Sequence, residues 1–256
     1  MINLHIIGVQ KAGTTALANF LHQHNDIYVV EGKEAHVFDH PDFEASPNKM
    51  AFAKGHYRQR LSGYAQQSVI CDATPITLFN KRFLQHCVAF NPKAKFIVVL
   101  RDPIERAISH YHMSQNRGQE SRCMLLAFLL EPWRLRHSQA QTSWPFNSNY
   151  RNHSYLSRGL YAQQLQTLFE LVPKKQILVI SQSDLKHNHQ QTLNKVFAFV
   201  DVDAQQISSK TVFTTDRNTH HWTDPIAKLY AKIYFWLKRQ PGNQWHQLLS
   251  RDRPYR

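Results

Sequence analysis

The feature that most restricts the fold of this chain is an apolar run at residues 96–100, Phe-Ile-Val-Val-Leu, which no polar residue interrupts. A strand exposed on one face alternates apolar and polar residues, so this run predicts a strand covered on both faces, as in a parallel sheet. Arg101, Asp102 and Pro103 follow it. Asp is a common N-cap and Pro a common first helical residue, so a helix is predicted directly after the strand.

Strand-like and helix-like patterns alternate along the rest of the chain. Short apolar runs predict further strands at residues 4–9, 27–30, 68–71 and 176–180. Apolar residues at helical spacing predict one helix that starts at residue 16 and another that ends at about residue 90. They also predict helices over residues 156–172, 192–200 and 226–237. This alternation predicts an α/β fold with three P-loop-like layers, in which helices flank a central parallel β-sheet. Ligands of such sheets bind beyond the carboxyl ends of the strands.

A predicted anion site lies where the first strand meets the first helix. Gly8 and Gly13 frame the turn, Lys11 lies within it, and Thr14 and Thr15 begin the helix. The first N–H groups of a helix lack partners within the helix and point at an anion, while the lysine and the hydroxyls add further donors. The turn differs from the nucleotide P-loop, G-x-x-x-x-G-K-[ST], because Thr14 occupies the lysine position. A capped helix after a buried strand is the alternative explanation.

A second predicted anion site follows the strand at residues 95–100. Arg101 stands at the carboxyl end of that strand, and Ser109 lies two turns into the next helix. A guanidinium presents forked donors that suit phosphate, and a serine hydroxyl adds another donor. The alternative for Arg101 is an ion pair at the strand end, and Arg106 is expected to brace the helix through Asp102 or Glu105.

These two motifs, in this order, resemble those of sulfotransferases that use 3′-phosphoadenosine-5′-phosphosulfate (PAPS). Residues 10–17 look like the 5′-phosphosulfate loop of that family, especially of the glycosaminoglycan (heparan sulfate-type) enzymes and their bacterial relatives, and residues 100–111 are similar to its 3′-phosphate motif. The resemblance implies transfer of a sulfuryl group to a hydroxyl or amine of a carbohydrate acceptor, with PAP as the product and no metal. The nucleotide contacts that it implies are Lys11, Ala12, Gly13, Thr14 and Thr15 on the 5′ side, and Arg101 and Ser109 on the 3′ side.

Residues 33–39 resemble the segment that carries the catalytic carboxylate in heparan sulfate sulfotransferases. The resemblance implies that Glu34 is the general base, with Lys33, His36 and Asp39 close to the acceptor. A sugar hydroxyl is a poor nucleophile, and removal of its proton contributes about 10²–10⁴-fold to the rate. We expect this role to need only a modest rise in the pKa of Glu34. His36 is the rival base, as in sulfotransferases that act on small phenols and alcohols.

The resemblance extends from about residue 3 to about residue 220 and is looser beyond the early motifs. It implies that Tyr161 lies near the nucleotide or the acceptor, with a core aromatic as the equal alternative, and that Arg217 contacts the donor. Ala73 stands where the glycosaminoglycan enzymes often have a lysine, which counts against a heparan-like acceptor. We expect one domain over residues 1–256, within which the irregular residues 117–152 help to form the acceptor cleft.

Composition limits the other classes of function. A formal charge of +13 predicts affinity for polyanions. Two alternatives remain open. The turn after the first strand also suits a P-loop-type kinase or NTPase, and the positive charge also suits a non-enzymatic basic nucleic-acid-binding protein. The displaced lysine counts against the first, and the lack of a recognisable nucleic-acid-binding module counts against the second. The 16 histidines show no metal-binding spacing.

Three cysteines without CxxC spacing, and the lack of a signal peptide or a long apolar run, predict a cytoplasmic protein without a transmembrane segment. Lys228 and Lys232 flank the aromatic-rich helix predicted near the C-terminus. Such a helix either covers the core or lies on an anionic membrane, and we favour the first interpretation.

Overall fold

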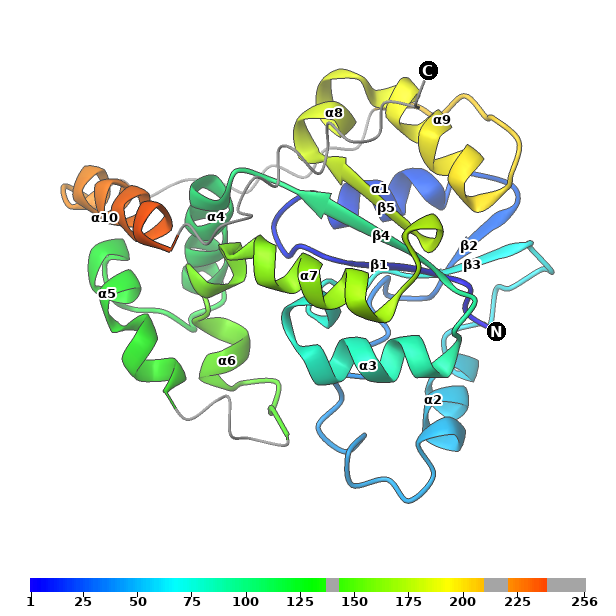
Figure 1. The fold of residues 1–256 in the computed structure, drawn as a ribbon, viewed down its shortest axis with the longest axis horizontal. Coiled ribbons are helices and arrows are strands. Elements are labelled where there is room, and N and C mark those ends of the chain that lie inside the picture. Colours follow the sequence, from blue (N-terminus) through cyan, green and yellow to red (C-terminus); the bar gives the residue numbers. More distant parts are fainter. Residues whose placement is uncertain (137–142, 210–220, 239–256) are drawn as a thin grey trace.

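The computed structural model describes residues 1–136, 143–209 and 221–238, and its centre is a parallel β-sheet (Figure 1). The strands are β1 Leu4–Gly8, β2 Ile27–Val29, β3 Val69–Asp72, β4 Lys95–Leu100 and β5 Ile177–Ser181. Their order across the sheet is β2-β3-β1-β4-β5, and each neighbouring pair is parallel. The predicted α/β fold with a parallel sheet is confirmed.

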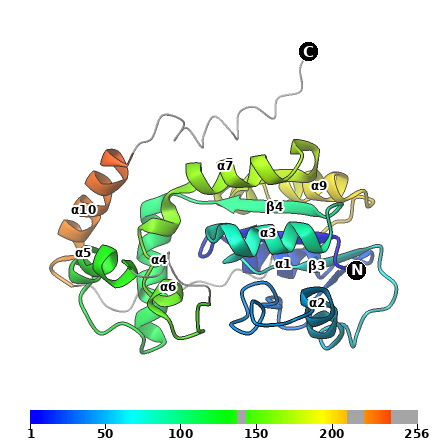
Figure 2. The ribbon, with the colours of Figure 1, turned by 60° about the horizontal axis from the view of Figure 1, so that its bottom comes forward.

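Helices connect the strands and cover both faces of the sheet. The helices are α1 Thr14–Leu21, α2 Lys49–Arg58, α3 Lys81–Phe90, α4 Pro103–Asn116, α5 Met124–Leu135, α6 Asn149–Asn152, α7 Tyr161–Leu171, α8 Gln182–His187, α9 His189–Val200 and α10 Asp224–Leu237. Short 3₁₀ turns are η1 Thr77–Phe79, η3 Ser157–Gly159 and η4 Lys174–Gln176. The two views together show α3 and α7 on one side of the sheet and α1 and α9 on the other (Figures 1 and 2).

The central strand β4 is buried on both faces, as the apolar run predicts. Residues 96–100 of β4 are completely buried between the two helical layers. The helix predicted after this strand also begins where expected. Asp102 caps α4, because its Oδ1 accepts hydrogen bonds from the N–H groups of Ile104 at 3.0 Å and Glu105 at 2.9 Å, and Pro103 is the first helical residue.

A second group of helices, α4, α5, α6 and α10, lies at one end of the molecule (left in Figure 1). Its small core includes Ala107, Tyr111, Phe128 and Tyr155. Residues 117–152 are therefore more regular than predicted, since they contain both α5 and α6.

The helix predicted over residues 156–172 begins late, at Tyr161. The carboxylate of Glu131 explains the delay, because it accepts hydrogen bonds from the N–H groups of Leu156 at 2.6 Å and Ser157 at 2.8 Å. Those groups are thereby engaged outside any regular helix, and the chain makes a 3₁₀ turn before α7 starts.

The orientation of α10 differs from the prediction. Its apolar pattern was expected to face the core. Tyr230 and Tyr234 do pack there beside Ala227 and Ala231, but Ile226, Leu229 and Ile233 are exposed. Small residues let two helices approach closely, so the alanines determine which side of α10 packs against α4 and α5. No helix in the described residues combines the length and the hydropathy that a membrane span requires.

Candidate functional site

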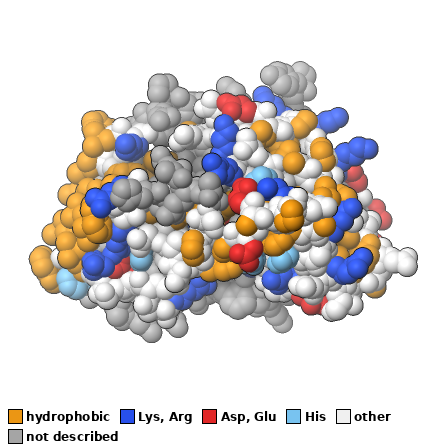
Figure 3. Space-filling model, turned by 90° about the horizontal axis from the view of Figure 1, so that it is seen from below, with side chains coloured by type: hydrophobic (Ala, Val, Ile, Leu, Met, Phe, Trp, Pro, Cys, Tyr) orange, Lys and Arg blue, Asp and Glu red, His pale blue; other side chains and the backbone are white. Residues whose placement is uncertain are grey.

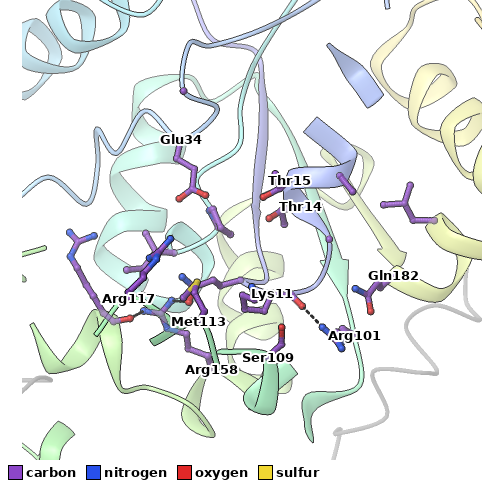
Figure 4. A pocket seen from close by; sticks show the side chains of 18 of the residues that line it. Lys11, Thr14, Thr15, Glu34, Arg101, Ser109, Met113, Arg117, Arg158 and Gln182 are labelled. Carbon is purple, nitrogen blue, oxygen red and sulfur yellow. Dashed lines mark hydrogen bonds between the residues drawn. The ribbon is translucent and has the colours of Figure 1, made fainter. Parts of the chain in front are cut away.

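A cavity of about 1030 Å³ opens beyond the carboxyl ends of the central strands (Figure 4). Binding pockets for small molecules and cofactors commonly enclose about 300–1,000 Å³, so this cavity has room for a large ligand or for two that meet. The loops after β1 and β2 and the helices α4 and α8 contribute to its wall. Its position agrees with the rule for parallel sheets.

The loop after β1 presents the start of α1 to the cavity. Gly13 precedes the helix in a left-handed conformation, with φ of 99°, and no side chain caps the helix. A residue with a Cβ atom would be strained at that φ, so the turn requires glycine there. Lys11, Thr14 and Thr15 line the cavity. Ala12 does not, because it is buried and its N–H donates to the carbonyl of Val9 at 3.1 Å.

Arg101 joins the two predicted anion sites. Its Nη1 donates a hydrogen bond to the carbonyl oxygen of Lys11 at 3.0 Å, and its Nη2 lies 3.7 Å from Oε2 of Glu105 (Figure 4). Ser109 lines the same cavity from α4. Residues about 90 positions apart in the sequence therefore form one continuous surface. Arg106 does not brace α4 as predicted: it is buried and donates from Nη2 to the carbonyl of Tyr155.

Positive charge accumulates on the wall of the cavity that carries Lys11 and Arg101. The pKa of Lys11 is lowered, first because the amine is partly buried and then because Arg117, Arg101 and Arg106 lie near it. Like charges held together in this way are costly until an anion neutralises them, which is how a protein prepares an anion site.

Glu34 faces this wall from the loop after β2 and points into the cavity (Figure 4). Lys33 forms an ion pair with its Oε1, and Nε2 of His36 lies 3.2 Å from its Oε2. On the other side of the imidazole, Nδ1 of His36 lies 2.8 Å from Oδ2 of Asp39. That oxygen also accepts a hydrogen bond from Nη1 of Arg151 at 2.5 Å. The five groups form a row of alternating charge that runs from Arg151 through Asp39, His36 and Glu34 to Lys33.

The contacts within this row of charged groups shift the pKa values of His36 and Glu34. Burial alone would lower the pKa of His36, but hydrogen bonds to Asp39 and Glu34 and their negative charges raise it to about 9. Burial would raise the pKa of Glu34, yet the hydrogen bonds and charges of His36 and Lys33 outweigh it, and the pKa is lowered. The expected modest rise for Glu34 is therefore wrong in direction. At neutral pH Glu34 is a carboxylate and His36 an imidazolium.

Asp72, at the end of β3, holds the loop that carries Glu34. Its Oδ1 accepts hydrogen bonds from the N–H of Ala35 at 3.2 Å and from the hydroxyl of Thr74 at 2.6 Å, and its Oδ2 accepts one from Tyr57 at 2.8 Å. The loop needs this support because Lys33 and His36 both have positive φ, of 68° and 51°. Such conformations are unfavourable for residues other than glycine.

We expect Asp72→Ala to lower the free energy of unfolding by about 3 kcal/mol, since it leaves several buried donors without an acceptor at about 1–3 kcal/mol each. Urea unfolding followed by circular dichroism measures the change. Asp42→Ala is the matched control, because Asp42 is exposed and lies in the segment that follows the same loop. Equal stability of the two variants would contradict the proposed support.

Three other predicted residues do not line the cavity as expected, and a fourth lies outside the described residues. Lys33 and Asp39 lie behind Glu34 and His36 as their partners. Tyr161 is buried, and its hydroxyl donates to the carbonyl of Arg101 at 3.0 Å, so it supports the strand end from the core. Arg217 lies outside the described residues.

The structure adds cavity residues that the motifs did not indicate. Gln182 follows β5 directly, and the common edge of a parallel sheet could have predicted it. Arg117 and Arg158 come from the helical group and carry no such signal. Arg158 is buried, donates to Oε1 of Gln10 at 2.5 Å, and has its pKa lowered to about 9, chiefly by burial. The described residues contain no group of three or more His, Cys, Asp and Glu that could hold a metal ion.

Comparisons with known proteins agree with this architecture. A family model described as a sulfotransferase domain matches residues 2–225. Heparan sulfate glucosamine 3-O-sulfotransferase 3A1 of Mus musculus is 29% identical over 198 residues, which are 76% of this chain and 44% of that protein. Heparan sulfate glucosamine 3-O-sulfotransferase 6 of Mus musculus is 28% identical over 176 residues, 69% of this chain and 45% of that protein. The chain thus spans less than half the length of these curated relatives.

The fold also matches a solved structure. The crystal structure of a sulfotransferase from Alicyclobacillus acidocaldarius superposes with a TM-score of 0.73 at 23% identity, over 93% of this chain and 92% of that one. At this level of identity the match establishes a shared fold.

Proposed function

This chain belongs to the sulfotransferase domain family, whose sulfuryl donor is PAPS, and we propose that it transfers the sulfuryl group to a hydroxyl or amine of a carbohydrate acceptor. The observation that carries the proposal is the hydrogen bond from Arg101 to the carbonyl of Lys11. It unites the two anion motifs in one cavity, and Glu34 faces them there.

The residues present fit a bisphosphorylated nucleotide. Lys11, Thr14 and Thr15 would hold the 5′-phosphosulfate at the start of α1, and Arg101 with Ser109 would hold the 3′-phosphate. Burial and the neighbouring arginines lower the pKa of Lys11, and an anion bound beside it would offset this positive charge. When bound, PAPS supplies an activated sulfuryl group.

The other roles in the reaction belong to side chains that line the cavity. Glu34 is ionised at neutral pH and accepts the proton of the acceptor as the new bond to sulfur forms. His36 is protonated between two carboxylates and cannot be the base in this state. It instead orients Glu34. Lys11 and the N–H groups at the start of α1 stabilise the charge that develops on the departing phosphate, so no general acid is required.

Two observations support a carbohydrate acceptor. The two similar mouse proteins are named as 3-O-sulfotransferases of heparan sulfate glucosamine. On the acceptor side, the cavity is lined by both polar and aromatic groups, including Gln119, Asn152 and Phe146, which can bond hydroxyls and contact a sugar ring. At the position where the glycosaminoglycan enzymes often have a lysine, Ala73 is uncharged and completely buried, so this position offers an acceptor no cationic contact.

Arg101→Ala is expected to weaken PAP binding by about tenfold or more, because hydrogen bonds from charged groups contribute about 1.5–3 kcal/mol. Calorimetric titration with PAP, beside ATP, measures the effect. Arg58→Ala, on the exposed side of α2, is the matched control. Wild-type protein should bind PAP more tightly than ATP.

The activity itself is tested with labelled PAPS and a panel of oligosaccharides. Incorporation of label into an oligosaccharide supports the proposal. Consumption of ATP together with no PAP binding would instead identify a P-loop-type kinase or NTPase, and salt-sensitive DNA binding without a response to PAP would identify a nucleic-acid-binding protein.

A further inference from the structure

Large apolar side chains lie together on the outside of the molecule, far from the sheet. They project from α5 and from α10 with the turn before it. We call this surface the α5–α10 face. Its exposed members are Leu126, Leu129, Trp133, Trp222, Ile226, Leu229, Ile233, Trp236 and Leu237. Figure 3 shows hydrophobic side chains gathered at that end of the molecule, with lysine and arginine beside them. Contiguous exposed apolar surface of this kind marks an interaction site.

The geometry of α10 makes the exposure systematic. Ile226, Leu229, Ile233 and Trp236 follow one another at steps of three and four residues, which places them along one side of the helix, and Trp222 lies in the turn before it. Exposed fractions of 56% for Leu229, 47% for Ile233 and 61% for Trp236 show that this side is bare. The helix therefore has two apolar sides, of which only the alanine side packs within the molecule.

The exposed charges on the described residues of the α5–α10 face are mainly positive. Lys228, Lys232 and Lys238 are exposed along α10, and the guanidinium of Arg136 lies 5.0 Å from the centre of the Trp133 ring. Within the described lengths of α5 and α10 there are two carboxylates. Glu131 is buried, where it accepts hydrogen bonds from backbone N–H groups, and Asp224 accepts one from the N–H of His221 at the first turn of α10. Neither offsets the lysine row.

We propose that the α5–α10 face binds the surface of an anionic lipid bilayer, with α10 lying in the plane of the interface. Apolar side chains would enter the boundary between headgroups and acyl chains, and the lysines would contact the anionic headgroups. Trp133, Trp222 and Trp236 suit that boundary because an indole combines an apolar ring with a polar N–H group. The net charge of +13 favours approach to such a surface.

Charge complementarity favours a bilayer over a second copy of the chain. In a two-fold symmetric dimer the same patch occurs on both sides, so the Lys228 and Lys232 row of one copy would lie near that of the other. The face carries no exposed carboxylate row to compensate, and like charges across an interface disfavour association. An anionic membrane supplies the opposite charge and the apolar phase together.

The position of the face gives the binding a consequence for the cavity. Helix α4 packs against α5 and α10 through Ala107, Ile108 and Tyr111, while Ser109 and Met113 on the same helix line the cavity. One helix thus separates the membrane-facing surface from the binding site. Docking would hold the cavity close to the bilayer.

Vesicle flotation tests the proposal with the full chain. We expect binding to vesicles of phosphatidylcholine with phosphatidylserine, and little binding to phosphatidylcholine alone. The paired substitution Leu229→Ser/Ile233→Ser should abolish most of it. Lys228→Glu/Lys232→Glu should weaken it by about thirtyfold or more, since each lysine near an anionic surface contributes about fivefold. The matched control is Lys174→Glu/Lys175→Glu, which makes the same charge change at exposed lysines on η4.

PAP affinity should be unchanged in every one of these variants, which separates this proposal from the proposed function and shows that the variants fold. Three results would overturn it. One is failure of the wild-type chain to bind anionic vesicles. Another is an equal loss with the η4 control. The third is a wild-type dimer in solution that Leu229→Ser/Ile233→Ser converts to a monomer, because the face would then be a subunit interface.

Discussion

Glu34→Gln lowers kcat by about 10²–10⁴-fold, the usual contribution of a positioned general base. The amide keeps the size of the side chain, and its single oxygen can still accept a hydrogen bond from Lys33 or from His36. Asp72 continues to hold the loop through the N–H of Ala35. It cannot take the proton of the acceptor. PAP affinity, measured by calorimetry, should stay at the wild-type value, because Glu34 is placed on the acceptor side of the cavity.

Glu31→Gln is the matched control, since Glu31 is an exposed residue of the same loop that bonds Ser62. The pH profile adds a second check. With Glu34 as the base, kcat/KM should be flat through neutral pH and fall only as the pH drops below 4.5, the ordinary value, because its neighbours lower the pKa. With His36 as the base, kcat/KM would instead rise about tenfold per pH unit towards pH 9. Wild-type turnover in Glu34→Gln would remove Glu34 from this role.

Lys11→Ala lowers kcat by about 10²–10³-fold, which is typical when one group that stabilises the developing negative charge is lost. PAP binding should weaken as well, because the lysine contacts the same phosphate before and after transfer.

The thermal stability of the Lys11→Ala variant should respond differently. The pKa of Lys11 is lowered by burial and by three arginines, so its charge costs folding free energy at neutral pH. The variant is expected to melt at the wild-type temperature or above it.

Single-turnover kinetics with labelled PAPS and differential scanning calorimetry measure the two effects. Lys54→Ala, on the exposed side of α2, is the control for the loss of one lysine. A Lys11→Ala protein that is inactive because it melts early would contradict the explanation, and so would one that retains full turnover.

The main fold could be predicted because its signals are local. The uninterrupted run at residues 96–100 can only be accommodated in a dry sheet, and β4 is completely buried there. Asp102 and Pro103 start α4 through bonds to the next few residues. Gly13 takes the positive φ that the turn before α1 requires. Such features depend on neighbours in the sequence, so the sequence contains them in full.

Other predictions were wrong, left open or missing, because the features concerned depend on contacts between residues that are distant in the sequence. The apolar stripe of α10 was expected inside, yet close packing through Ala227 and Ala231 turns part of it outwards. Tyr161 looked equally suited to the cavity and to the core, and its bond to the carbonyl of Arg101 holds it in the core. The cavity cations Arg117 and Arg158 belong to no motif.

The sequence alone indicated the five strands, most of the helices that follow them and the turns that carry Lys11 and Arg101, because backbone geometry and burial patterns arise from adjacent residues. It did not indicate α2, α5, α6 or α8. The tertiary structure determined which side chains of these distant segments contact one another. Arg101 meets the carbonyl of Lys11, and His36 lies between Glu34 and Asp39. The electrostatic effects that make Glu34 a carboxylate and His36 a cation at neutral pH act through space over a few ångströms, and the folded chain alone sets those separations.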